Sequence, residues 1–220
     1  MQRRFIIILG FIGLVAVTAS CGRSNVSLPI DAEIAANLEQ TDSQKPSLRE
    51  INLSLVNAIK WDKPDDVDQL LSEGASVEAE NRYGLKVIFI ASKFGNPAII
   101  TSLINASANV NETVETTFND DGVGYTGTMA GTPLSYAALE GRVEAMATLI
   151  KAGAEVNGLD PEGNMPLMRA AEGGHLPAVE WLLDQGANET ARAQALKSAQ
   201  MIFNPDENRQ AIVRVLQPPK

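Results

Sequence analysis

The chain has 220 residues, of which 45% are hydrophobic and 20% are charged. A chain of this length buries about 70% of its unfolded surface, which is enough for one domain with a sizeable core. Asp and Glu number 27 against 18 Lys and Arg, a net charge of −9. This balance disfavours nucleic acid as a partner, because binding a polyanion requires many cationic contacts. One Cys and one His exclude an intrachain disulfide and argue against a Cys/His metal cluster, so we predict no metal and no cofactor.

Residues 1–20 have the pattern of a secretory signal peptide. Arg3 and Arg4 precede a thirteen-residue apolar run, Phe5 to Val17, and small residues follow it. A membrane-spanning helix needs about 20 apolar residues, so this run is short for one.

The only Cys, Cys21, directly follows Val17-Thr18-Ala19-Ser20. This arrangement resembles the lipobox of bacterial lipoproteins, in which the Cys is acylated and becomes the first residue of the mature protein. The resemblance implies that Cys21 anchors the chain in a bacterial cell envelope. Gly22, in place of Asp, implies the outer membrane, with the protein on its inner leaflet facing the periplasm. The alternative is an ordinary signal peptide followed by a free Cys.

Residues 21–46 are rich in Ser, Asn, Gln and Ala, with Pro29 and Pro46, and we expect them to form a tether. Within it, residues 31–39 have the apolar spacing of a short helix.

The rest of the chain, residues 47–217, repeats itself with a period of 33. Thr132 to Gly141 align with Met165 to Gly174, and Leu149 aligns with Leu182 at the same offset. Between Ala108 and Ala154 the offset is 46, so thirteen residues are inserted there. Such a period is typical of stacked helical repeats, in which we expect the two leucines to be core residues of equivalent helices.

The motifs inside this period make the resemblance specific. They are Thr132-Pro133-Leu134, Ala137-Ala138, Gly153-Ala154-Glu155-Val156-Asn157 and Gly186-Ala187-Asn188. These segments resemble ankyrin repeats, which implies an all-α repeat solenoid whose helix pairs are joined by finger-like turns. Pro is suited to the first turn of a helix and Gly to the residue that ends one. The His common after Thr-Pro-Leu in that family is missing, and the second repeat reads Lys86-Val87-Ile88-Phe89, so we expect a weaker turn network there.

We assign four repeats and a closing cap. The first begins with a capping box, Ser47 to Glu50, and the cap has helical spacing without a finger motif. The repeats span residues 47–80, 81–111, 127–159 and 160–190, and the cap spans 191–216.

The insertion, residues 112–126, has a period of two. Val114, Thr116 and Phe118 alternate with polar residues, and Asn119 to Gly122 form a turn signal. This pattern predicts a β-hairpin that lengthens the finger between the second and third repeats.

Several catalytic or ligand motifs have simpler explanations. Gly122 to Gly127 match G-x-G-x-x-G but do not open a helix, so phosphate binding is not expected. Asn119 to Asp121 supply too few ligands for calcium, and Asp62 to Asp68 lie where carboxylates favour a helix N-terminus. His175 lies where ankyrin repeats carry a structural His, and no nucleophile elbow accompanies it. We predict no catalytic residue and no enzymatic activity.

The ends of the first helices predict a protein-binding surface. Lys60-Trp61 and Lys93-Phe94 recur in register, which would place two aromatic residues along the inner groove beside cationic ones. Trp, Tyr and Arg carry much of the binding energy at interfaces. The alternative is that Trp61 and Phe94 are core residues that close helix ends. The predicted partner-binding set is Lys60, Trp61, Arg82, Tyr83, Leu85, Lys93, Phe94, Phe118, Asp120, Asp121, Tyr125 and Met129.

The two resemblances together imply a monomeric, lipid-anchored module that binds another protein. Lipoproteins of this kind resemble immunity proteins, which neutralise toxins such as lipases delivered into the periplasm. An alternative is an envelope-stress or assembly factor, similar to the periplasmic ankyrin proteins associated with catalase.

Overall fold

The computed structural model describes residues 46–120, 125–201 and 206–217; for residues 116–120 and 125–129 it describes the backbone alone. The chain divides into two units, Met1 to Gln44 and Lys45 to Lys220, and the described residues belong to the second. The predicted signal peptide, Cys21 and nearly all of the predicted tether lie outside the described residues.

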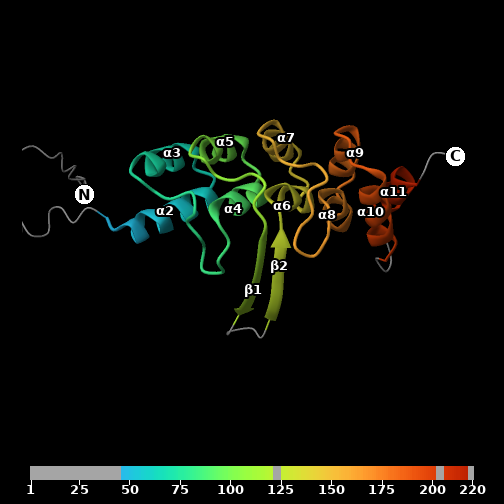
Figure 1. Cartoon of the computed structure of the whole chain (residues 1–220), viewed down its shortest axis with the longest axis horizontal. Helices are drawn as coiled ribbons and strands as arrows, with labels where there is room; N and C mark the ends of the chain where they lie inside the picture. Colours follow the sequence, from blue (N-terminus) through green and yellow to red (C-terminus); the bar gives the residue numbers. More distant parts are fainter. Residues whose placement is uncertain (1–45, 121–124, 202–205, 218–220) are drawn as a thin grey trace, which may run out of the picture. The chain divides into compact units, whose positions relative to one another are not determined.

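The second unit is built from pairs of antiparallel helices. Helices α2, α4, α6, α8 and α10 pack in one row, and α3, α5, α7 and α9 form a second row beside it (Figure 1). Helix α11 packs on α9 and α10 and closes the end of both rows. The helices are α2 (Leu48–Lys60), α3 (Pro64–Ser72), α4 (Val87–Phe94), α5 (Pro97–Asn105), α6 (Pro133–Leu139), α7 (Val143–Lys151), α8 (Pro166–Gly173), α9 (Leu176–Asp184), α10 (Glu189–Met201) and α11 (Glu207–Leu216). The predicted all-α repeat solenoid with a helical cap is confirmed.

Side-chain caps fix where the first helix of a repeat begins. The predicted capping box is present: the Glu50 N–H donates to Ser47 Oγ over 3.3 Å, and the Ser47 N–H donates to the Glu50 carboxylate over 2.8 Å. In α6, Thr132 and Ser135 exchange the same pair of bonds, 3.1 and 2.7 Å long. Each box satisfies backbone N–H groups that would otherwise lack a partner at the helix start.

The second repeat starts its first helix differently. Lys86 occupies the N-cap of α4, and its side chain makes no capping hydrogen bond. Its ammonium instead pairs with the carboxylates of Glu112 and Glu78, and these bonds raise the pKa of Lys86. The Lys86 side chain therefore makes an ion pair across the finger and accepts no hydrogen bond from the N–H groups at the start of α4.

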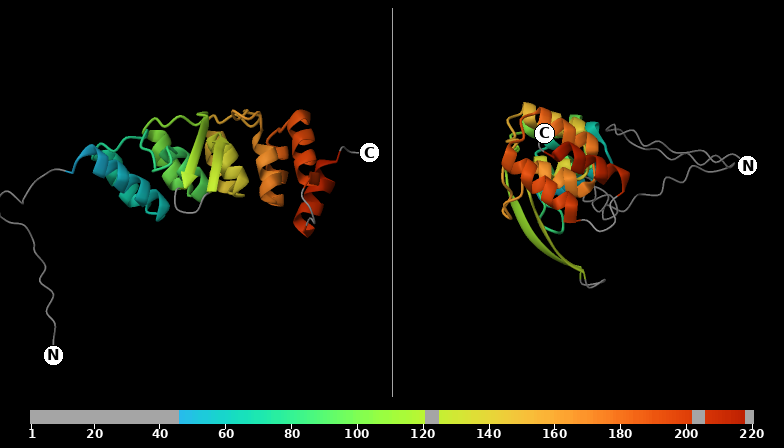
Figure 2. Two further views of the ribbon diagram at one scale, coloured as in Figure 1. Left: turned by 90° about the horizontal axis from the view of Figure 1, so that it is seen from below. Right: turned by 90° about the vertical axis from the view of Figure 1, so that its right-hand side faces the viewer.

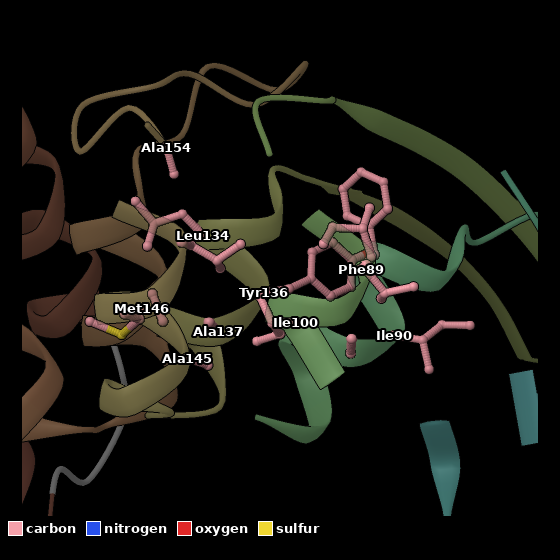
Figure 3. Packing of buried hydrophobic residues seen from close by; sticks show 14 of the residues in the cluster. Phe89, Ile90, Ile100, Leu134, Tyr136, Ala137, Ala145, Met146 and Ala154 are labelled. Atoms are coloured by element: carbon pink, nitrogen blue, oxygen red, sulfur yellow. The ribbon is translucent and has the colours of Figure 1, made fainter. Parts of the chain in front are cut away.

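The core lies between the two rows of helices. Ala137 and Ala138 of α6 are fully buried, and their small side chains let neighbouring first helices approach closely. Leu149 and Leu182, 33 residues apart, are both 0% exposed, as predicted for equivalent core positions. Phe89 meets Tyr136 edge-to-face, with ring centroids 5.5 Å apart (Figure 3). The core is thus continuous from one repeat to the next.

Asparagine side chains tie neighbouring repeats together at the ends of the second helices. The Asn111 amide donates to the Gly153 carbonyl over 2.9 Å and accepts from the Glu155 N–H over 2.9 Å. Asn157 makes the equivalent pair of bonds to Gly186 and Asn188 in the next repeat. The Asn that ends the Val-Asn motif therefore bridges backbone groups of the repeat that follows.

His175 has a structural position. It is the N-cap residue of α9, and a Cβ added to Gly141 would lie 2.5 Å from its ring. The equivalent residue one repeat earlier, Arg142, packs in the same way over Gly95. The ring therefore fills the space above a glycine of the preceding repeat.

The insertion forms the predicted β-hairpin. Strands β1 (Val114–Asp120) and β2 (Tyr125–Gly131) pair antiparallel, from Val114 opposite Gly131 to Asp120 opposite Tyr125. Figure 2 shows the two strands extending away from the helices. Strand β2 continues beyond residue 126, the predicted end of the insertion, through Gly131 to the residue before the α6 cap. The inserted strand merges with the returning half of the finger, so the repeat period does not mark its end.

Across the described ranges, no helix has the length and apolar character needed to cross a membrane.

Candidate protein-binding surface

Two exposed aromatic residues occupy equivalent positions in the first two repeats. Trp61 follows the last residue of α2 and is 70% exposed, while Phe94 ends α4 and is 44% exposed. Helices α2 and α4 pack side by side, so the two positions are neighbours in the row formed by α2, α4, α6, α8 and α10. The alternative that both residues close the core is not what the structure shows.

The fourth repeat has no space for an aromatic residue at this position. Its equivalent residue is Gly173, where an added Cβ would lie 2.2 Å from the carbonyl oxygen of Leu139. The third repeat carries Glu140 there. Exposed aromatic residues at this position are therefore confined to the first half of the row.

The predicted cationic side chains differ in their exposure and in whether they are already paired. Lys60 is exposed, whereas Lys93 is half-buried and its ammonium lies 3.6 Å from a Glu140 carboxylate oxygen. Arg82 lies over the ring of Tyr83, 4.6 Å from its centroid, and donates to its hydroxyl. Tyr83 holds the guanidinium in place on an exposed turn, so less side-chain entropy remains to be lost on binding.

Leu85 does not belong to the surface, and this part of the prediction was wrong. Its side chain is only 3% exposed. The Asn81 side chain accepts from the N–H groups of Tyr83 and Leu85, over 2.9 and 3.0 Å, and this tight turn directs Leu85 into the core. Leu85 anchors the finger.

The predicted hairpin residues lie in the described strands as backbone positions. Asp120 pairs with Tyr125, Phe118 with Gly127, and Met129 with Thr116. Asp121 lies outside the described residues, as does Cys21. The proposed contact roles of the hairpin residues remain predictions.

A pocket of about 150 Å³, which was not predicted, lies where the hairpin meets α6 and α8. We call it the Tyr136 pocket. Tyr136 and Arg169 stand 33 residues apart at equivalent positions of adjacent first helices. This register is the signal in the sequence from which their proximity could have been predicted. The pocket is lined by Lys93, Ala130, Ser135, Tyr136, Leu139, Glu140, Glu162 and Arg169.

Arg169 organises the floor of this pocket. Its Nη2 lies 2.7 Å from a carboxylate oxygen of Asp160, which is fully buried, and 3.1 Å from one of Glu162. Its Nη1 lies 3.1 Å from a Glu172 oxygen. Nη2 also donates to the Ala130 carbonyl over 3.4 Å, which links the fourth repeat to β2. Both terminal nitrogens of the guanidinium are thus engaged by carboxylates or by the foot of the hairpin.

The Tyr136 hydroxyl has no hydrogen-bond partner in the part of the chain that the structure describes. The residue is 7% exposed. Burial raises the pKa of Tyr136 to about 12, so the phenol is neutral at physiological pH. The hydroxyl can then both donate and accept a hydrogen bond.

An open groove of about 730 Å³ continues along α8, α10 and α11. Met168 and Met201 supply apolar surface, and Lys197 and Arg209 supply charge. Arg209 donates to the Glu172 carbonyl over 3.0 Å, so the cap contributes to this groove as well as closing the core.

Within residues 46–120, 125–201 and 206–217, no three His, Cys, Asp or Glu side chains cluster in a way that suits a metal ion.

Comparison with known proteins agrees with this geometry. A family model described as ankyrin repeats (3 copies) matches residues 55–157 and 112–193. The chain belongs to the ankyrin-repeat family. The repeat is typically a non-enzymatic protein-interaction domain, so the fold defines a protein-binding module.

Two relatives show how far the similarity extends. B-cell lymphoma 3 protein homolog of Mus musculus is 28% identical over 170 residues, which are 77% of this chain and 33% of the relative. Ankyrin repeat protein nuc-2 of Neurospora crassa is 25% identical over 147 residues, 67% of this chain and 13% of the relative. The chain therefore spans a third or less of either protein's length.

Proposed function

We propose that this protein is a lipid-anchored module that binds a protein partner at a bacterial cell envelope and inhibits it. The observation that carries the binding role is the pair Trp61 and Phe94. They expose large aromatic surfaces at equivalent, neighbouring positions of a rigid row of helices. Exposed aromatic side chains on rigid elements are the usual anchors of interfaces, because they bury much area for little lost entropy.

Two further features support binding at this end of the row. The Arg82–Tyr83 pair projects from the finger between the two repeats that carry the aromatics. The β-hairpin follows the second of these repeats and extends from the helices (Figure 2). A projecting hairpin beside a rigid surface suits entry into the cleft of an enzyme, and this supports an inhibitor over a passive scaffold. No catalytic role is proposed for the chain.

The envelope location rests on Cys21 and the segment before it. Replacing the thiol with a hydroxyl, as in Cys21→Ser, removes the acceptor for the lipid. We expect this variant to incorporate no radiolabelled palmitate and to leave the membrane fraction, while the unaltered chain is labelled and sediments with membranes. Persistent labelling of Cys21→Ser would show that the anchor lies elsewhere.

Site-specific cross-linking in the producing cell tests the binding surface. A photoreactive p-benzoylphenylalanine replaces Trp61 in one variant and Leu53 in its control, since Leu53 lies on α2, the helix that Trp61 directly follows, and is 60% exposed. We expect one protein to cross-link at position 61 and not at position 53. Equal products at both positions would contradict the assigned surface.

The inhibitory part has its own readout. The cross-linked partner, once purified, is assayed for hydrolase activity with and without the full chain. We expect its activity to fall with a one-to-one titration. If the partner binds through Trp61 and keeps full activity, the binding role stands and the inhibitory role is wrong. That result would favour an assembly or stress factor.

A further inference from the structure

A second surface with the character of a binding site lies at the end of the solenoid away from Trp61. It is the open groove of about 730 Å³ along α8, α10 and α11, which we call the cap groove. Figure 1 shows these three helices at the end farthest from α2. The volume falls within the roughly 300–1,000 Å³ typical of ligand sites, so several side chains of a ligand fit there. The cap groove is lined by Asn164, Met168, Glu172, Gln194, Lys197, Ser198, Met201 and Arg209.

The cationic side chains of the cap groove have no carboxylate partner. In the part of the chain that the structure describes, neither Lys197 nor Arg209 makes an ion pair. The Glu172 carboxylate, in contrast, already has partners. One of its oxygens lies 3.1 Å from Nη1 of Arg169, and the other accepts from Ser198 Oγ over 3.5 Å. Two cations against one carboxylate leave the lining with a formal charge of +1.

Packing holds the Arg209 guanidinium in place and leaves most of its donors unused. Nη1 donates to the Glu172 carbonyl over 3.0 Å, and a Cβ added to Gly174 would lie 3.4 Å from Cζ. Arg142 packs in the same way over Gly95. A guanidinium has five N–H donors, and the described residues accept one hydrogen bond from this one. A side chain that is already ordered loses little entropy when it binds a ligand.

Apolar surface lies directly beside the cationic groups. Lys197 and Met201 are four residues apart on α10, so they share one face of the helix. Lys197 is exposed and Met201 is 75% exposed. Met168 of α8 is half-buried and lines the same groove. Methionine side chains are flexible and polarizable, so they adapt to apolar groups of different shape.

We propose that the cap groove binds a protein segment in which acidic residues alternate with apolar ones. Its carboxylates accept hydrogen bonds from Lys197 and Arg209, and its apolar side chains pack on Met168 and Met201. A basic segment would instead meet two unpaired cations and the carboxylate of Glu172, whose oxygens are engaged. An open groove that runs over three helices suits an extended segment, whereas a small molecule is normally enclosed.

This docking site goes beyond the proposed function, because the cap groove shares no residue with the surface around Trp61 and Phe94. The protein as a whole carries a net charge of −9, so the attraction for an acidic segment is local to the groove. The contacts made by Lys197 and Arg209 must therefore distinguish this site from the rest of the surface.

A peptide titration tests the cap groove without any natural partner. The full chain, with carbon-13 in its methionine methyl groups, is titrated with acetyl-Glu-Leu-Glu-Leu-Glu-amide and followed by NMR. The Met168 and Met201 signals are assigned by their loss in Met168→Leu and Met201→Leu. Met146, which is fully buried in α7, is the internal reference. The matched probes carry Gln or Lys in place of each Glu, and inorganic phosphate is the small-anion probe.

We expect the glutamate peptide to shift the Met168 and Met201 signals saturably and to leave the Met146 signal in place. The glutamine and lysine peptides should bind at least about fivefold more weakly. Lys197→Gln should weaken binding of the glutamate peptide about threefold or more. Lys151→Gln removes an equal charge from an exposed lysine in the last turn of α7, and it should leave the affinity unchanged.

Several results would overturn the proposal. They are a glutamine or lysine peptide that binds as tightly as the glutamate peptide, an equal loss in Lys197→Gln and Lys151→Gln, and the absence of a saturable shift. If phosphate saturates the same signals as tightly as the glutamate peptide, the groove is a site for a small anion and the proposed segment is wrong. The titration needs no cross-linked partner, so a failure at Trp61 would leave its result standing.

Discussion

At the scale of single residues, the repeats reveal where the chain departs from its own pattern. Ser107 adopts a left-handed backbone with φ of 74°, at the position where the other repeats carry Gly74, Gly153 and Gly186. A side chain disfavours this conformation by about 1–2 kcal/mol, part of which Gly recovers. The second repeat therefore contains a locally strained residue that its neighbours avoid.

Substitution at this position should have opposite effects in two repeats. We expect Ser107→Gly to raise the free energy of unfolding by about 0.5–1 kcal/mol, because it relieves the backbone. Gly153→Ala should lower it by about 1 kcal/mol, since an added Cβ there meets no atom within 4 Å and the cost is conformational alone. Urea unfolding measures both, and a loss of stability in Ser107→Gly would contradict the account.

The Tyr136 hydroxyl should contribute little to stability at neutral pH. At neutral pH, Tyr136→Phe removes a buried hydroxyl that makes no hydrogen bond to the described residues, so we expect its stability to stay within about 0.5 kcal/mol of the parent. Because the pKa is raised to about 12 from 10.0, the folded state holds this proton more tightly than the unfolded state. That stabilisation is complete below pH 10 and is lost as pH rises toward 12.

Unfolding followed from pH 9 to 12 checks the sign. The parent protein should lose more stability over this range than Tyr136→Phe does. Parallel curves for the two proteins would mean that the phenol titrates alike in the folded and unfolded states.

At the scale of helices and strands, most of the fold was predictable because its signals are local. The start of α6 depends on Thr132, Pro133 and Ser135, which lie within four residues of one another. The period of 33 then carries the pattern from one repeat to the next. The exposure of Trp61 and Phe94 follows the same register.

The features that sequence reasoning missed depend on contacts between distant segments or on ambiguous patterns. A leucine in a turn can be exposed and contact a partner, or it can be buried in the core. At Leu85 the turn formed by the Asn81 side chain buries it. The sequence does not mark the end of β2 at Gly131, because the strand runs directly into the returning half of the finger. The Tyr136 pocket combines residues from Lys93 to Arg169, and only the fold brings them together.

At the scale of the whole molecule, stability is shared between neighbouring repeats. Leu149 is a fully buried residue of α7, and Leu182 has the equivalent position in α9. Each repeat contacts the next, so a cavity in one weakens the docking of its neighbours.

Truncating either leucine should therefore affect the entire unit. We expect Leu149→Ala and Leu182→Ala each to lower the free energy of unfolding by about 2–5 kcal/mol, because both remove fully buried methyl groups. Leu159→Ala, on a residue that is 53% exposed, is the control and should change it by less than about 0.5 kcal/mol. Losses below about 0.5 kcal/mol at both core positions would show that the repeat register is wrong.

The central claim is that this chain binds its partner through the exposed aromatic residues of its first two repeats. The most direct measurement uses the partner that cross-linking identifies, purified on its own. Isothermal titration calorimetry gives its affinity for the full chain, for Trp61→Ala and for the control Leu53→Ala. The account predicts that Trp61→Ala costs roughly 2 kcal/mol or more, about thirtyfold in Kd, while Leu53→Ala leaves the affinity unchanged. An affinity that survives Trp61→Ala, or that falls equally in both variants, would contradict it.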